Sequence, residues 1–174
     1  ARGRRLKSVP GDTTRPILDR VKTALFDILR PRLEGISILD LFAGSGSVGI
    51  EALSQGAAHV TFLDLAPAAV RTIRENLETT GFTEAAEVRS ADAFAYLRAT
   101  RKVFDLIFVA PPQYKALWIQ AMQCIGERPS LIAPGGQIVV QIDPSEYEPL
   151  QLAAFREVSQ RKYGSTLLVF YEPT

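Results

Sequence analysis

A glycine-rich turn in the first third of the chain is the segment best suited to bring backbone close to a ligand. It runs from Asp40 to Gly46 and follows a nearly continuous apolar stretch over 36–42, which predicts a strand buried on both faces. Gly44 carries no side chain, and a helix beginning at Ser47 would aim its free N–H groups at the same point. In an open parallel sheet such a turn lies at the carboxyl ends of the strands, where ligands bind. The residues of the turn that we expect to hold a cofactor are Asp40, Phe42, Ala43, Gly44, Ser45 and Gly46.

Two classes of cofactor suit this turn. Gly44, Gly46 and Gly49 match the GxGxxG spacing of nicotinamide dinucleotide sites, and Asp64 follows Gly44 by 20 residues, as in such sites. A nicotinamide-dependent oxidoreductase is therefore one hypothesis. Against it, the sequence has no Tyr-x-x-x-Lys pair, and its single histidine, His59, falls at the beginning of the expected second strand, away from the ligand edge.

Acidic residues at three successive strand ends favour a different cofactor. Asp40 can reach the amine of an amino-acid-bearing ligand, Asp64 can bind both ribose hydroxyls, and Asp92 can accept from the exocyclic amine of an adenine. Three acids suit a cationic ligand without phosphates, which indicates S-adenosylmethionine, with Leu65 and Ala93 as further contacts. The alternative for each acid is a helix N-cap, above all for Asp92, which precedes an expected helix.

A pair of prolines after the expected fourth strand offers a place for the substrate. Ala110 and Pro111–Pro112 present carbonyl oxygens into the crevice, because proline has no N–H to compete for them. Such acceptors suit the exocyclic amine of a nucleobase, whose lone pair must be freed from the ring as a methyl group arrives. We expect Ala110, Pro111, Pro112 and Tyr114 to form the catalytic segment, with Tyr114, or else Phe42 or Tyr163, stacking on the base. Alternatively, the prolines only end the strand and Tyr114 packs beneath them.

The positive charge of the chain is concentrated at its N-terminus. Residues 1–32 carry nine basic and three acidic side chains, whereas residues 33–174 carry 11 basic and 16 acidic ones, so a +6 segment precedes a −5 body. This asymmetry predicts a basic arm that grips a polyanion such as RNA. A solvated tail that aids solubility is the alternative. The expected RNA contacts are Arg2, Arg4, Arg5, Lys7, Arg15, Arg20 and Lys22.

The composition is that of one soluble domain with an ordinary core. The chain has 174 residues, of which 47% are hydrophobic and 22% charged, and no apolar run approaches the roughly 20 residues of a membrane span. The single Cys124 excludes an internal disulfide and a cysteine metal cluster. We therefore expect a cytoplasmic monomer that needs no metal and has no membrane contact.

Short apolar runs alternate with helical patterns along most of the chain. This rhythm predicts an α/β fold, with a mostly parallel sheet covered by helices on both faces. A further helix follows Pro16, and a link containing Gly164 suits an antiparallel hairpin near the end of the chain. The expected strands are 36–42, 59–64, 86–90, 104–110, 137–142, 155–161 and 166–171, and the other expected helices are 47–55, 67–80, 93–99 and 116–125.

Beyond these general features, the sequence resembles the RsmD-like 16S rRNA guanine-N2 methyltransferases over nearly its whole length. The segments that carry the resemblance are the turn 40–46 with the following 49–57, and the N-terminal stretches 2–6, 15–16, 19–22 and 25–26. It implies a Rossmann-like class I methyltransferase fold of seven strands with an antiparallel last strand, formed by residues 33–174 behind a basic arm and helix at 1–32. It also implies methyl transfer from S-adenosylmethionine to the 2-amino group of a guanine in 16S rRNA, either free or within a small-subunit assembly intermediate.

One position departs from the pattern of that family. The fourth-strand motif is usually Asp-Pro-Pro followed directly by Tyr or Phe, whereas this chain has Ala110 before the prolines and Tyr114 one place late. The missing carboxylate removes a side-chain acceptor for the target amine and leaves the backbone carbonyls. An RNA-binding, methyltransferase-like protein with weak or lost activity is therefore the third hypothesis.

Overall fold

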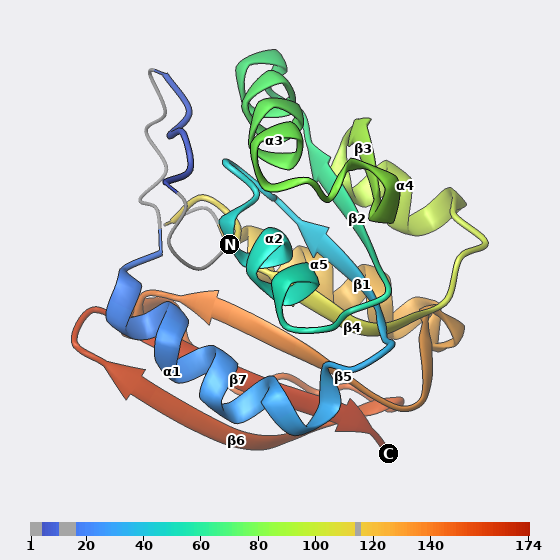
Figure 1. Ribbon diagram of the computed structural model, residues 1–174. Helices are drawn as coiled ribbons and strands as arrows, with labels where there is room; N and C mark the ends of the chain where they lie inside the picture. Colours follow the sequence, from blue (N-terminus) through green and yellow to red (C-terminus); the bar gives the residue numbers. More distant parts are fainter. Residues whose placement is uncertain (1–4, 11–16, 114–115) are drawn as a thin grey trace.

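The chain is built around a seven-stranded sheet with the strand order β3-β2-β1-β4-β5-β7-β6 (Figure 1). The computed structural model describes residues 5–10, 17–113 and 116–174. Neighbouring strands are parallel except at β7, which is antiparallel to both β5 and β6. The expected fold class, with its antiparallel last strand, is confirmed. The strands are β1 Ser37–Leu41, β2 His59–Asp64, β3 Ala86–Ser90, β4 Phe104–Val109, β5 Ile132–Ile142, β6 Phe155–Tyr163 and β7 Thr166–Pro173.

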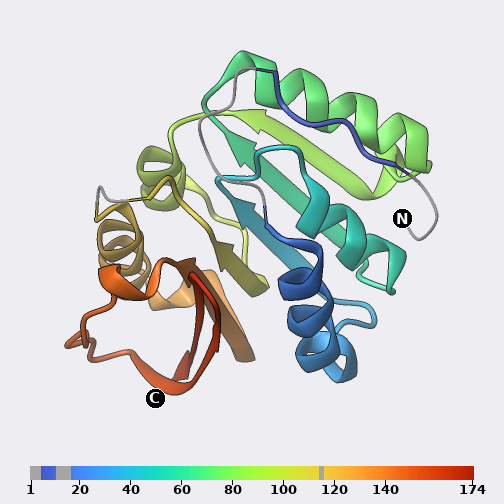
Figure 2. The ribbon, with the colours of Figure 1, turned by 90° about the vertical axis from the view of Figure 1, so that its left-hand side faces the viewer.

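Helices cover both faces of the sheet. α1, α2 and α3 pack into one apolar cluster, and α4 and α5 pack into another on the opposite face, as the two views in Figures 1 and 2 show. The helices are α1 Asp19–Leu29, α2 Ser47–Ser54, α3 Pro67–Thr80, α4 Ala93–Ala99 and α5 Leu117–Glu127, with short 3-10 segments at Arg30–Arg32, Thr83–Ala85, Pro129–Leu131 and Pro144–Glu146. Within the described ranges, no helix is long and apolar enough to cross a membrane.

The clearest difference from the sequence pattern lies in β5. The boundaries of β2, α3, β3 and α4 are as predicted, but β5 begins at Ile132 rather than at residue 137. The intervening Ala-Pro-Gly-Gly at 133–136 has the composition of a turn, yet it continues the strand. The register of the β4–β5 pairing shifts next to this segment, between Phe104 and Leu106. A Cβ on Gly136 would lie 2.7 Å from the carbonyl oxygen of Asp105. Glycine at this position therefore permits the close approach of the two backbones.

The two ends of the chain also bear on the sequence predictions. α1 begins at Asp19, and its N-cap residue, Leu18, provides no side-chain cap. At the other end, β6 and β7 form the predicted antiparallel hairpin, and Gly164 in the link adopts a φ of 58°.

α2 approaches β2 closely at Gly49. A Cβ on Gly49 would overlap the Phe62 ring and lie 2.9 Å from Val60 Cγ1. Both neighbours are fully buried, so neither can move aside without disturbing the core. Gly49 therefore sets the distance between helix and sheet, and with it the position of the first turn of α2.

Gly49→Ala should accordingly destabilise the protein, although alanine favours helices. We expect the free energy of unfolding, measured by chemical denaturation, to fall by about 1–3 kcal/mol, because the added methyl group overpacks a closed core. Gly126→Ala is the matched control, since Gly126 also lies in a helix but its Cβ would meet only the end of the Leu152 side chain, 3.2 Å away. Equal changes in the two variants would contradict this explanation.

Candidate active site

The glycine-rich turn leaves β1 through a residue in the left-handed region. Phe42 has a φ of 66° although it is not glycine. The Ala43 N–H then donates to the Leu63 carbonyl oxygen at 2.8 Å, and the Gly44 N–H donates to Asp64 Oδ2 at 2.9 Å. The turn is thereby held against the end of β2, and Asp64 has a structural role in addition to its expected contact with a ligand.

Asp40 is a buried acid beneath the first turn of α2. It is 2% exposed, it accepts a hydrogen bond from the Gly49 backbone N–H, and its Oδ2 atom has no partner among the described residues. Burial raises the pKa of Asp40 to about 8; the Gly49 hydrogen bond opposes this rise, and the charge of Asp64 adds to it. A buried acceptor without a partner is suited to bind a donor group of a ligand.

A cavity of about 620 Å³ opens at the carboxyl ends of β1, β2 and β3. Asp64 and the exposed Leu65 form part of its wall, and the two oxygens of Asp64 accept the N–H groups of Gly44 and Ala66. Each carboxylate oxygen retains a further lone pair for a ligand hydroxyl. The residues predicted from the sequence that line this cavity are Phe42, Gly44, Asp64, Leu65, Asp92, Ala93, Ala110 and Pro112.

Asp92 fulfils the alternative role foreseen for it while also lining the cavity. Its Oδ2 accepts the Ala95 N–H at 2.9 Å and caps α4, whereas Oδ1 makes no hydrogen bond within the described ranges. Phe94, which sequence reasoning missed, meets Phe42 edge to face with ring centroids 6.2 Å apart. No signal in the sequence separates Phe94 from an ordinary apolar residue of a helix, because its role arises from a contact with a distant turn.

A second cavity, of about 320 Å³, lies on the α1 side of the turn. The two cavities share Val9, Phe42, Gly44 and Ala110. The smaller one brings together the predicted residues Asp40, Ala43, Ser45 and Pro111 with Gln113, Gln141 and Thr166, which were not predicted. Gly46 lines neither cavity and instead forms the N-cap of α2 with a φ of 82°. Tyr114 lies outside the described residues. Two adjoining cavities are the arrangement that group transfer between two ligands requires.

Asn76 of α3 joins the turn to the N-terminal segment. Its Nδ2 donates to the Ser45 carbonyl oxygen at 2.9 Å and to the Lys7 carbonyl oxygen at 3.0 Å. Its Oδ1 accepts the Lys7 backbone N–H at 2.8 Å. Because Asn76 is 1% exposed, these three hydrogen bonds form away from competing water.

The N-terminal arm, residues 5–10, closes one side of both cavities. Val9 lines both, Pro10 lines the larger one and Ser8 the smaller one. Figures 1 and 2 show the arm running beside α3. Sequence reasoning assigned the arm to RNA alone and missed its place in the walls of the two cavities.

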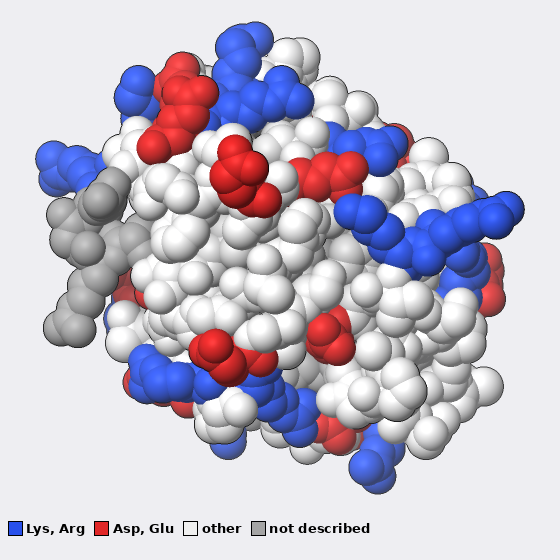
Figure 3. All heavy atoms as spheres, turned by 45° about the vertical axis from the view of Figure 1, so that its right-hand side comes forward, with Lys and Arg blue, Asp and Glu red and all other residues white. Residues whose placement is uncertain are grey.

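The basic residues expected to contact RNA are distributed unevenly. Arg5 and Arg20 are exposed and Lys22 is half-buried, while Lys7 is exposed and pairs with Glu75 at 2.9 Å. The expected contacts that lie outside the described residues are Arg2, Arg4 and Arg15. On the face shown in Figure 3, the coloured Lys and Arg side chains are interspersed with Asp and Glu. That face therefore offers RNA no continuous basic surface among the described residues.

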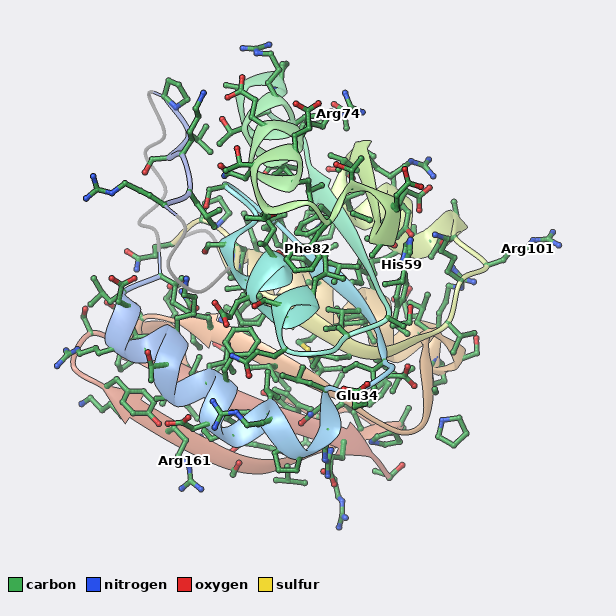
Figure 4. The ribbon with its side chains drawn as sticks, in the orientation of Figure 1. Glu34, His59, Arg74, Phe82, Arg101 and Arg161 are labelled. Atoms are coloured by element: carbon green, nitrogen blue, oxygen red, sulfur yellow. The ribbon has the colours of Figure 1, made fainter. Side chains whose placement is uncertain are left out.

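The single histidine is remote from this site. His59 is the first residue of β2, at the end of the strand opposite the turn, and Figure 4 shows it on the side away from the arm. Burial lowers its pKa, and the charge of Lys102 lowers it further. The neutral form of His59 is therefore favoured, and His59 lines neither cavity.

Asn76→Ala should loosen the arm and the turn together. The variant leaves part-buried backbone groups at Ser45 and Lys7 without these partners. We expect the free energy of unfolding to fall by about 2–3 kcal/mol, and amide hydrogen exchange at Lys7 to accelerate. Glu75→Gln is the matched control because it removes only the exposed ion pair with Lys7, which is worth less than about 1 kcal/mol. An unchanged exchange rate at Lys7 in Asn76→Ala would refute the link.

Comparison with known proteins gives concordant matches. The family described as "Conserved hypothetical protein 95" matches residues 1–172. YlbH of Bacillus subtilis, provisionally named an rRNA methyltransferase, is 36% identical over 174 residues, covering 98% of this chain and 94% of that protein. Ribosomal RNA small subunit methyltransferase D of Haemophilus influenzae is 37% identical over 145 residues, and the match covers 82% of this chain and 75% of that protein. The solved structure of yhhF from Escherichia coli, a proposed methyltransferase, superimposes with a TM-score of 0.85 at 30% sequence identity. The match covers 99% of this chain and 93% of that chain. The chain therefore belongs to the Conserved hypothetical protein 95 family, the RsmD family that its sequence resembles.

Proposed function

We propose that this protein transfers the methyl group of S-adenosylmethionine to the 2-amino group of a guanine in 16S rRNA. The observation that carries the proposal is the pair of cavities that meet at Phe42 and Ala110, one bordered by Asp64 and Asp92 and the other by Pro111. Relatives that are 36% and 37% identical and are named as rRNA methyltransferases support both the reaction and the RNA substrate.

In the proposed complex, S-adenosylmethionine lies along the glycine-rich turn. Its amino group binds the unpartnered Oδ2 of Asp40, its ribose hydroxyls bind Asp64, and its adenine amine binds Oδ1 of Asp92. The adenine ring lies against Leu65 and Ala93, and the backbone of the turn lies along the rest of the molecule. The bound sulfonium supplies an electrophilic methyl carbon. The fit is supported by a buried acceptor in one cavity and two acids in the other.

The protein's own part in the reaction is to place the guanine amine. The carbonyl oxygens of Ala110 and Pro111 hold the amine hydrogens, so that the nitrogen lone pair turns out of the ring and toward the methyl carbon. When held by Asp40, Asp64 and Asp92, the cofactor would supply the methyl carbon to this nitrogen and leave as a neutral thioether, and the methylated amine would lose one proton to solvent. In-line positioning of the two reactants supplies a large part of the rate.

The N-terminal segment is the proposed contact with the RNA backbone. The exposed Arg5 and Arg20, together with Arg2, Arg4 and Arg15, would neutralise RNA phosphates and make the affinity depend on salt. We propose that the protein acts as a monomer in the cytoplasm, on free 16S rRNA or on a small-subunit assembly intermediate.

A nicotinamide dinucleotide fits the same turn poorly. A pyrophosphate binds through free backbone N–H groups at a helix N-terminus. Here the Gly44 N–H donates to Asp64 and the Gly49 N–H donates to Asp40. Two acids therefore occupy the donors that the phosphates would need, and the oxidoreductase hypothesis is not favoured.

Transfer of labelled methyl groups from S-adenosylmethionine to 16S rRNA and to small-subunit assembly intermediates tests the proposal. We expect incorporation at a guanine, identified by mass spectrometry of the nucleosides. Ala110→Asp should raise kcat about tenfold, because a charged acceptor forms a stronger hydrogen bond with the amine. If neither protein methylates any guanine while both bind cofactor and RNA, the chain is a binding protein and the proposed activity is wrong.

Asp40→Asn should weaken cofactor binding. It should also make the protein more stable at high pH, where the buried Asp40 of the unaltered protein ionises. The pKa of Asp40 is raised from 3.8 to about 8 in the folded protein, so between these values the native state binds more protons than the unfolded state. Its contribution to stability is full below about pH 4 and is lost as the pH rises through 8. At pH 8, the free energy of unfolding of Asp40→Asn should therefore exceed that of the unaltered protein.

The affinity for S-adenosylmethionine should fall about tenfold or more in Asp40→Asn, because a charge-assisted hydrogen bond is lost. Calorimetry at pH 6 and pH 8 should also show that the unaltered protein binds more tightly at the higher pH, since the carboxyl must ionise to pair with the ammonium. Asp105→Asn, at the opposite end of the sheet where Asp105 accepts the Ser37 N–H, is the control and should leave cofactor affinity unchanged. Undiminished affinity in Asp40→Asn would exclude the proposed contact.

A further inference from the structure

The register of β4 and β5 places a polar side chain beside Ala110. Val109, the last residue of β4, pairs with Val140 of β5, so the register places Ala110, just past the end of β4, level with Gln141. Side chains alternate between the faces of a strand, and Gln141 therefore lies on the same face as Val139, the face that α1 covers. Both Ala110 and Gln141 line the smaller cavity.

The amide of Gln141 has unused hydrogen-bonding capacity. Its Oε1 atom is buried and has no partner, and its Nε2 atom makes no hydrogen bond within the described ranges. The amide can therefore turn and present either its oxygen or its nitrogen to the cavity without breaking an existing bond. A buried amide left unsatisfied is unfavourable by roughly 1–3 kcal/mol, which a polar ligand in the cavity would recover.

We propose that Gln141 binds the Watson–Crick edge of the target guanine and substitutes in part for the carboxylate that position 110 lacks. The inference rests on the proposed function. A guanine edge carries two kinds of donor, N1–H and the 2-amino group, beside the O6 acceptor, and an amide can meet a donor and an acceptor of the same edge. Gln141 thus holds the base while the carbonyls of Ala110 and Pro111 hold the amine.

Two other polar side chains at the cavity, those of Asp40 and Thr166, are less suited to this contact. Asp40 already accepts the Gly49 N–H and lies under the turn that the cofactor occupies. Thr166 offers a single hydroxyl oxygen, which cannot span two neighbouring atoms of a base edge as the oxygen and nitrogen of an amide can. Gln141 projects from β5, which is paired with Leu168 of β7 at this position and with β4 through the preceding Val140, so its backbone is held beside the end of β4.

Replacement of Gln141 by Leu and by Glu tests the inference. Gln141→Leu should lower kcat/KM for RNA methylation about 10- to 100-fold at saturating S-adenosylmethionine, because the base loses its edge contact. Its cofactor affinity, measured by calorimetry, should stay within about twofold of that of the unaltered protein. Gln141→Glu should retain or exceed the original kcat/KM, since two carboxylate oxygens can accept both N1–H and a 2-amino hydrogen of guanine.

Gln137→Leu is the matched control. Gln137 lies on the same strand and the same face, four residues earlier, and it does not line the cavity. Its replacement should leave kcat/KM for RNA unchanged. An unaltered kcat/KM in Gln141→Leu, or a loss equal to that in Gln137→Leu, would overturn the inference while leaving the proposed function intact.

The same variants separate this inference from the activity itself. If the unaltered protein and Ala110→Asp both transfer no methyl group, the proposed function fails. The readout is then the dissociation constant for a 16S rRNA fragment in the presence of S-adenosylmethionine. Weaker binding by Gln141→Leu than by Gln137→Leu supports the base contact, and equal binding refutes it.

Discussion

Every contact in the site depends on β1 lying parallel between β2 and β4. The registers pair Leu41 with Leu63 on one side and with Val109 on the other, so the three strands end at the same level. The turn after β1 can therefore reach the Leu63 carbonyl oxygen and Asp64 through single hydrogen bonds. Parallel pairing also requires crossover helices whose N-termini return to this edge. One constraint thus gathers a glycine-rich turn, helix N-termini, acids and a Pro-Pro segment along one edge of the sheet.

The arm belongs to the site because a distant helix holds it there. Its residues form no helix or strand, and the backbone of Lys7 is bound by an asparagine 69 positions later. α3 is itself fixed in the core through Ile73 and Leu77. The hydrogen bonds of Asn76 therefore attach the arm to a rigid part of the molecule. Because one amide binds both Lys7 and Ser45, order in the arm and order in the turn are linked. Two proposed ligands, RNA and cofactor, therefore meet on a shared element.

The sequence predicts correctly those elements whose apolar pattern agrees with the residues that begin and end them. α3 begins at Pro67 and stops at Gly81, which adopts the left-handed conformation that favours glycine, and both signals are local. The start of β5 could not be predicted, because residues 133–136 continue a strand only through their fit against β4. Site residues divide in the same way, into those with a local sequence signal and those that depend on distant contacts. Asp40, Asp64 and Asp92 follow from their places at strand ends, and the structure puts each beside a cavity.

The residues that sequence reasoning missed at the site come from segments far apart along the chain. Val9 and Pro10 reach the cofactor cavity only through the contact of their arm with α3, and Phe94 does so through its ring contact with Phe42. Gln141 is one of several polar residues near a strand end, and only the register of β4 and β5 distinguishes it. No local pattern encodes such neighbours, since each depends on a contact between segments that are far apart in the sequence.

The distribution of unsatisfied polar atoms bears on what the smaller cavity holds. Six buried side-chain oxygens have no partner among the described residues, and two of them, on Asp40 and Gln141, belong to the lining of this cavity. The others, which include three hydroxyls, line neither cavity. A hydroxyl can rotate to reduce its loss, whereas a buried carboxyl and a primary amide forgo larger hydrogen-bonding capacity. An apolar ligand would leave both groups unsatisfied. An ammonium group of the proposed cofactor near Asp40 and a nucleobase edge of the proposed substrate near Gln141 would satisfy both side chains, so this cavity suits one part of each reactant.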